Sequence, residues 1–140
     1  MTPQDKCVAE ARKYIGAKWR HRGRKPWALD CIGLIVASVH AGGAPVEDRT
    51  DYGLEPWKDG LQADLERQFG EPVADWLPGD IALMRRDGGT EPAHVGVLAD
   101  SPYGGLALIH SYRMVGVTEH RIDEHWRELI VAVYRPRWPV

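Results

Sequence analysis

The sequence predicts an α+β fold in which helices come first and an antiparallel β-sheet follows. Between residues 4 and 69, three segments have patterns typical of helices: 4–15, 31–41 and 61–69. From Leu77 onward, short apolar runs alternate with turns that contain Gly and Pro, which is typical of strands joined as hairpins. The chain has 140 residues, 44% of them hydrophobic, and we expect a single domain over residues 1–140.

The first half of the chain is predicted to alternate helices with loops. Residues 4–15 place apolar side chains among charged ones and form an amphipathic helix that ends at Gly16. Residues 17–29 form a basic, aromatic loop, because Gly and Pro interrupt any regular pattern there. Residues 44–60 are a second loop, rich in Gly, Pro and Asp, and residues 61–69 form a short surface helix.

The helix over residues 31–41 is predicted to be the buried centre of the fold. Asp30 is a favourable N-cap residue, and Gly42-Gly43 ends the helix. Apolar residues lie on nearly every side of it, so no face is left for solvent.

The second half is predicted to supply the sheet. Pro78-Gly79-Asp80 makes a turn into the first strand, and residues 86–92 form a polar loop. The predicted strands cover residues 81–84, 94–99, 106–111, 114–118 and 129–135.

Composition excludes several classes of protein. A formal net charge of −2 argues against a general nucleic-acid-binding surface. Two cysteines cannot build a disulfide-rich scaffold, although a Cys7–Cys31 bridge remains open on number alone. The longest apolar run, residues 32–39, is too short to span a bilayer. Residues 1–6 are polar and lack the apolar run of a signal peptide, so we expect synthesis in the cytoplasm.

Cys31 is the candidate nucleophile, because it occupies the first turn of the central helix. Unpaired backbone N–H groups and the helix dipole favour a thiolate there. His94 opens one predicted strand and His110 lies near the end of the next, so antiparallel pairing would place the imidazoles side by side. Cys31, His94 and His110 would then form a thiol-hydrolase triad. The alternatives are a zinc site made of the same three residues, and plain structural packing.

Other candidate residues have simpler interpretations. Cys7 lies on the apolar face of the first helix and is interpreted as packing. The basic residues of the 17–29 loop either form a solvated surface or bind carboxylates of a substrate. The remaining histidines are interpreted as surface or loop residues: His21, His40, His120 and His125.

Four segments together resemble the NlpC-type cysteine peptidases. Residues 11–35, with Asp-Cys-Ile-Gly-Leu near their end, resemble the nucleophile region of that family. Residues 78–100 contain the family's Gly-Asp strand followed by His-Val-Gly. LIHSY at residues 108–112 resembles its third polar position, and residues 118–136 resemble the ending of its phage branch.

The resemblance implies a papain-like core in which Cys31 is the nucleophile, His94 the general base and His110 the orienting residue. It implies no cofactor and no metal. The implied activity is cleavage of peptide bonds in the stem peptides of bacterial peptidoglycan. The branch that resembles this chain most is found with tail proteins of prophages and gene transfer agents. We therefore expect tail-hub or baseplate partners, a place in a virion or tail particle, and action at the cell wall.

The chain departs from the family pattern around the expected substrate contacts, which are Trp19, Arg20, Arg22, Asp30 and Ile32. Many members have Tyr where this chain has Trp19, and Ser where it has Ile32. Two alternatives stay open: a papain-like amidase that cuts the muramyl–L-alanine bond, and a non-catalytic tail-hub protein that retains the fold.

Overall fold

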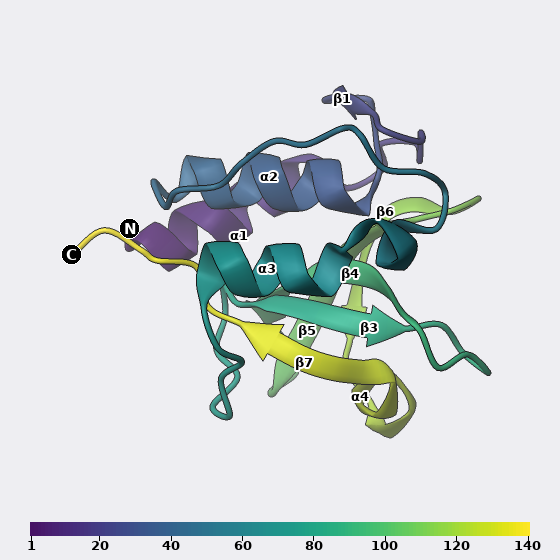
Figure 1. Ribbon diagram of the computed structural model, residues 1–140. Helices are drawn as coiled ribbons and strands as arrows, with labels where there is room; N and C mark the ends of the chain where they lie inside the picture. The colour runs from purple at the N-terminus through teal and green to yellow at the C-terminus, as the bar shows by residue number, and fades with distance from the viewer.

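The computed structural model describes residues 1–140 and confirms the predicted α+β class. A five-stranded antiparallel sheet, in the order β6-β5-β4-β3-β7, forms its centre (Figure 1). The strands are β3 (Ile81–Arg85), β4 (Pro92–Asp100), β5 (Leu106–Tyr112), β6 (Gly116–Arg121) and β7 (Ile130–Tyr134).

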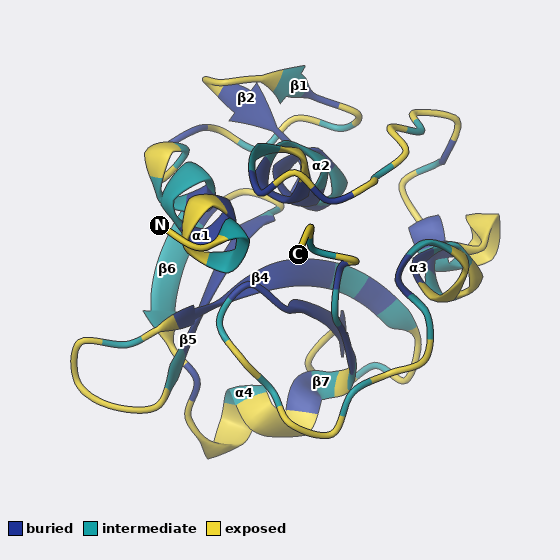
Figure 2. Ribbon diagram, turned by 90° about the vertical axis from the view of Figure 1, so that its left-hand side faces the viewer, coloured by how far each residue is buried: buried dark blue, intermediate teal, exposed yellow.

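The helices lie on both faces of this sheet. Helices α1 and α2 cover one face, and the short helix α4 lies at the other (Figures 1 and 2). The helical segments are α1 (Pro3–Lys13), α2 (Cys31–Ala41), the 3-10 turn η1 (Pro56–Asp59), α3 (Leu61–Phe69) and α4 (Glu124–Leu129). No helix combines the length and the apolar character that a membrane crossing requires.

The main core fills the layer between the helices and the sheet. Leu34 and Val39 of α2 and Val97 and Ile109 of the sheet belong to one buried cluster of 22 residues (Figure 2). Fully burying one such side chain stabilises the fold by about 1.5–3 kcal/mol. A smaller cluster on the opposite face includes Leu108 and lies against the half-buried Trp126 of α4. The buried character predicted for the 31–41 helix is therefore confirmed.

Helix α1 begins as expected but ends earlier than predicted. Thr2 and Asp5 form a reciprocal capping box, and Pro occupies the first turn. The helix ends at Lys13, with Tyr14 as its C-cap, instead of reaching residue 15. The chain leaves the helix here because the N–H of Gly16 donates to the carbonyl of Val117 on β6.

Helix α2 has the boundaries predicted for it. The carboxylate of Asp30 accepts a hydrogen bond of 2.8 Å from the N–H of Gly33, which is the geometry of an N-cap. The cap therefore places Cys31 at the first helical position.

Other segments also differ from the sequence prediction. The 17–29 loop contains a small hairpin, β1 (Arg24–Lys25) and β2 (Ala28–Leu29). The fourth strand of the large sheet begins at Gly116 and not at residue 114, because Met114 adopts a left-handed conformation in the turn. Helix α4 occupies residues that were not predicted to be helical, and Asp123 caps it by accepting from the N–H of Trp126.

Candidate active site

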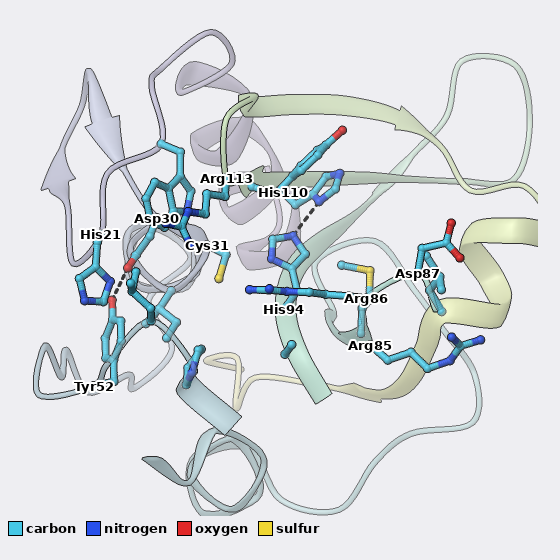
Figure 3. Close-up of a pocket in the computed structure, with 18 of the residues that line it drawn as sticks. His21, Asp30, Cys31, Tyr52, Arg85, Arg86, Asp87, His94, His110 and Arg113 are labelled. Atoms are coloured by element: carbon cyan, nitrogen blue, oxygen red, sulfur yellow. Dashed lines mark hydrogen bonds between the residues drawn. The ribbon is translucent and has the colours of Figure 1, made fainter. Parts of the chain in front are cut away.

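A pocket of about 450 Å³ lies where the N-terminus of α2 meets strands β3, β4 and β5. Cys31, His94 and His110 all line it, and Figure 3 shows the Cys31 sulfur and the His94 ring within the same cavity. Segments far apart in the sequence complete its wall: Trp19, Tyr52, Arg86, Arg113 and Trp126. The topology thus brings together the three residues that the sequence singled out.

Cys31 lies almost fully buried at the start of α2, with a free thiol. Burial raises the pKa of the thiol to about 12, and the neighbouring Asp30 acts in the same direction. The backbone N–H groups of Val95, Ile32 and Cys31 itself lower the pKa, but by less than burial raises it. The start of the helix therefore acts in the predicted direction, but desolvation of the charge outweighs it and leaves the pKa of the thiol raised.

Asp30 is a buried carboxylate whose two oxygens are fully occupied. One oxygen accepts from the N–H of Gly33 and from Nη1 of Arg24 at 3.1 Å. The other accepts from the N–H of Arg22 at 2.9 Å and from the hydroxyl of Tyr52 at 2.5 Å, as Figure 3 shows in part. A buried charge is stable only when it is paired and hydrogen-bonded, and these contacts anchor the loops to the start of α2.

His94 and His110 lie side by side on strands β4 and β5, as the sequence predicted. His94 Nε2 and His110 Nδ1 are 2.8 Å apart (Figure 3). This contact occupies Nε2 of His94 and leaves its Nδ1 for another partner. Burial, and after it the charge of Arg86, lowers the pKa of His94 to about 4, so the ring is neutral at physiological pH.

The surroundings of His110 fix its ring. The Tyr112 ring stacks on it with centroids 4.6 Å apart, and the Trp126 ring meets it edge-on at 5.3 Å. A Cβ at Gly96 would come within 2.6 Å of Leu108 and 3.1 Å of the His110 Cβ, so only glycine leaves room beneath the two side chains. Burial lowers the pKa of His110 to about 2, with the neighbouring histidines acting in the same direction.

His120 was interpreted from the sequence as a surface or loop residue, and this interpretation is wrong. It lies on β6, half-buried, with its Nε2 2.8 Å from Nε2 of His110. Its position two residues beyond the partner of His110, Thr118, would have indicated the contact, but only once the β5–β6 register was known.

The expected substrate contacts divide into two groups. Trp19, Asp30 and Ile32 line the pocket, whereas Arg20 and Arg22 do not. Arg22 is committed to the fold, since its Nε donates to the carbonyl of Tyr52 at 2.7 Å.

Two cations that the sequence analysis missed line the pocket instead. The guanidinium of Arg113 lies 5.5 Å from the ring centroid of Trp19, and that of Arg86 lies 5.5 Å from the ring centroid of Trp57. Neither guanidinium forms a salt bridge. Stacking on an aromatic face holds such a cation in place while leaving its N–H donors free for an anion.

No group of three or more His, Cys, Asp or Glu side chains is arranged to hold a metal ion. The imidazoles of His94, His110 and His120 bond to one another instead. The arrangement can therefore support proton transfer along a row of rings next to a thiol.

No protein-family model and no curated protein sequence matches the chain. Among solved structures, NlpC1 from Trichomonas vaginalis matches with a TM-score of 0.71 at 19% identity, over 99% of this chain and 45% of the other. NlpC2 from the same organism matches with a TM-score of 0.70 at 18% identity, over 99% and 48%. The NlpC/p60 domain of the peptidoglycan hydrolase SagA matches with a TM-score of 0.60 at 21% identity, over 94% of this chain and 97% of that domain.

The chain spans about half the length of the two Trichomonas proteins and nearly all of the SagA domain. The similarity extends over the helices and the whole sheet, at identities that carry the fold alone. The chain therefore has the papain-like fold of the NlpC/P60 proteins.

Proposed function

We propose that the protein is a cysteine peptidase that hydrolyses amide bonds in the stem peptides of bacterial peptidoglycan. The observation that carries this proposal is the meeting of Cys31 and His94 in one pocket, with Nε2 of His94 held by His110 and Nδ1 left for the thiol. The shared fold with an NlpC/p60 domain of a peptidoglycan hydrolase supports the choice of substrate.

The reaction is acyl transfer to water. Sγ of Cys31 attacks the carbonyl carbon of the scissile amide while the thiol proton passes to Nδ1 of His94. The imidazolium then protonates the leaving nitrogen, the C–N bond breaks, and a thioester remains on Cys31. His94 next takes a proton from water, whose oxygen attacks the thioester. The C–S bond breaks, the thiol regains its proton, and the product leaves as a carboxylic acid.

The start of α2 supplies donors for the oxygen of the tetrahedral intermediate. The N–H groups of Cys31 and Ile32 occupy the first two helical positions and have no partner within the helix. Backbone donors fixed in this way stabilise negative charge that develops during attack. Trp19 also lines the pocket, and its indole N–H is a further donor where many members of the NlpC-type family carry a Tyr hydroxyl.

The charge of the pocket favours a substrate with free carboxylates. Arg86 and Arg113 line the pocket without an acidic partner. The carboxylate of Asp30 also lines it, but Asp30 already forms an ion pair with Arg24. Stem peptides carry such carboxylates on D-glutamate and diaminopimelate. Guanidinium groups bind carboxylates through two parallel hydrogen bonds, so these two arginines are the proposed substrate contacts.

The test is digestion of purified muropeptides with the full chain, followed by mass spectrometry of the products. We expect wild-type protein to cleave within the stem peptide and Cys31→Ala to have no turnover. Cys7→Ala is the matched control, because Cys7 is a buried thiol of the core that does not line the pocket, and it should retain activity. Hydrolysis by Cys31→Ala would overturn the proposal.

The same experiment distinguishes two reactions that a papain-like site can carry out. Cleavage between amino acids of the stem releases peptide fragments, whereas cleavage of the muramyl–L-alanine bond releases the intact stem from the sugar. The first product pattern supports the endopeptidase and the second supports the amidase.

We further propose that the enzyme works within a phage or gene-transfer-agent tail, where it opens the cell wall locally. The resemblance of residues 118–136 to the ending of the phage branch supports this setting. We expect the chain in purified tail particles, detected by mass spectrometry, and bound to tail-hub proteins. Particles that contain the chain but never cleave muropeptides would favour the non-catalytic hub protein instead.

A further inference from the structure

His94, His110 and His120 form a row of three imidazoles, of which the proposed triad uses only the first two. His94 Nε2 and His110 Nδ1 are 2.8 Å apart, and His110 Nε2 and His120 Nε2 are again 2.8 Å apart. At the far end of the row, His120 Nδ1 lies 3.1 Å from the carbonyl oxygen of Arg121. The row runs from the pocket that holds Cys31 to a solvent-open groove of about 470 Å³ that His120 lines.

The last contact determines where every proton of the row lies. A carbonyl oxygen only accepts hydrogen bonds, so Nδ1 of His120 carries the proton and donates it to Arg121. In a neutral imidazole the other nitrogen is an acceptor, so Nε2 of His120 accepts from Nε2–H of His110. By the same rule, Nδ1 of His110 accepts from Nε2–H of His94. Nδ1 of His94 is therefore left without a proton.

This tautomer is the one that the proposed reaction needs. The base that deprotonates Cys31 must present an unprotonated nitrogen, and Nδ1 of His94 is the nitrogen not engaged by His110. If His120 donated to His110 instead, both following rings would reverse, and His94 would present an N–H to the thiol. The hydrogen bond that orients a histidine also selects which of its nitrogens is protonated.

The packing holds His120 in this position. The ring centroid of Trp126 lies 4.3 Å from that of His120 and 5.3 Å from that of His110, so one indole contacts both rings. The β5–β6 pairing fixes the backbone, with Leu108 opposite His120. Burial lowers the pKa of His94 and of His110, which keeps both rings neutral as the tautomer assignment requires.

We propose that His120 is a positioning residue that fixes the tautomers of His110 and His94, so that Nδ1 of His94 is free to accept the thiol proton of Cys31. This inference rests on the proposed cysteine peptidase activity, which it deepens by adding a fourth residue. The tautomers themselves exist without substrate, so they can be measured independently of that activity.

The first experiment is long-range ¹H–¹⁵N correlation of the histidine rings in the full chain at neutral pH. We expect the Nε2-protonated form for His94 and His110 and the Nδ1-protonated form for His120. A proton on Nδ1 of His94 in the wild-type protein, or a doubly protonated His120, would overturn the inference whatever the activity is.

The second experiment compares substitutions that keep or remove the hydrogen-bond acceptor at residue 120. In His120→Gln the amide oxygen still accepts from His110, and we expect the same tautomers with kcat within about 3-fold of wild type. In His120→Lys the side chain only donates, and we expect reversed tautomers and a fall in kcat of about 10²-fold or more, with little change in KM. His40→Lys adds the same charge at an exposed site on α2 outside the pocket and should leave kcat unchanged.

The outcomes separate the two proposals. Loss of kcat in His120→Lys with unchanged His94 tautomers would overturn the positioning role, as would normal kcat with reversed tautomers. Hydrolysis by Cys31→Ala would overturn the proposed function, while the tautomers would still test the role of His120. Where His120→Lys fails to fold, His120→Met removes the hydrogen bond without adding charge, and wild-type kcat in that variant would overturn the inference.

Discussion

Gly33 lies directly against the backbone carbonyl of Gly23: an added Cβ at Gly33 would come within 2.5 Å of that oxygen. Nη1 of Arg24 and Oδ1 of Asp30 lie nearly as close to the same point, at 3.1 and 3.3 Å. The loop that forms one wall of the pocket therefore rests on the first turn of α2 at a position that only glycine allows. This contact explains why a glycine stands two residues after Cys31.

Gly33→Ala should destabilise the protein although alanine is the better helix former. The helix propensity of alanine contributes about 1 kcal/mol in its favour. The backbone clash outweighs this gain, and we expect the free energy of unfolding to fall by about 1–3 kcal/mol in urea denaturation. Gly53→Ala is the control, because its Cβ would meet its nearest neighbour at 3.5 Å, and it should stay within about 0.5 kcal/mol of wild type. Equal stability of Gly33→Ala and wild type would contradict the packing argument.

Acid should destabilise the fold through the buried His110. Its pKa is lowered from 6.5 to about 2 by burial, so between these values the unfolded chain binds a proton that the folded chain excludes. The stability contributed by the neutral ring is thus complete above pH 6.5 and falls as the pH decreases. The expected slope is about 1.4 kcal/mol per pH unit for this single proton.

His110→Asn isolates that contribution, because asparagine does not titrate and still offers an acceptor to His94 and a donor to His120. Its free energy of unfolding, measured in urea from pH 6.5 downward, should fall less steeply than that of wild type by the slope of one proton. Parallel curves for His110→Asn and wild type would show that the ring titrates normally in the folded state.

The parts of the fold that could be predicted from the sequence depend on local patterns. Helix α2 is defined by the Asp30 cap, a continuous apolar run and Gly42-Gly43, so both of its ends were predicted. The adjacency of His94 and His110 follows from two strands joined by a short turn. These features need no knowledge of distant contacts, because hydrogen bonds and side-chain spacing within a few residues specify them.

The remaining parts depend on long-range contacts or on turns without a sequence signal. Met114 adopts a left-handed conformation that favours glycine or asparagine, so the start of β6 was misplaced. The contact of His120 with His110 was missed because it depends on the register between β5 and β6. The basic residues of the 17–29 loop were predicted either to be solvated or to bind carboxylates of a substrate, but Arg24 bonds to Asp30 and, at 2.8 Å, to Asp48. Nothing in the 17–29 segment itself indicates those partners.

Arg113→Gln should weaken substrate binding more than it slows the chemistry. The guanidinium stacks on Trp19 at the pocket wall, and a charge-assisted hydrogen bond to a carboxylate is worth about 1.5–3 kcal/mol. We therefore expect KM for muropeptides to rise by about 10-fold or more, with kcat nearly unchanged. Arg20→Gln removes an exposed charge of the loop outside the pocket and is the control.

A second substrate tests the same contact without relying on a single variant. Muropeptides whose carboxylates are amidated should bind the wild-type protein more weakly than the free acids. Arg113→Gln should lose this discrimination, and discrimination that survives in Arg113→Gln would assign it to Arg86 instead.

The pH dependence of kcat should report the environment of His94. The proposed reaction needs its neutral ring, and burial together with the charge of Arg86 lowers its pKa from 6.5 to about 4. Because activity is lost only when the ring is protonated, kcat should stay constant as the pH falls below 6.5 and decline near pH 4. Figure 3 shows the Arg86 side chain running alongside His94, so Arg86→Gln should move the decline toward higher pH, whereas Arg113→Gln should leave it in place. A wild-type decline centred at pH 6.5 would mean that the ring is solvated during catalysis, and would contradict the burial described for it.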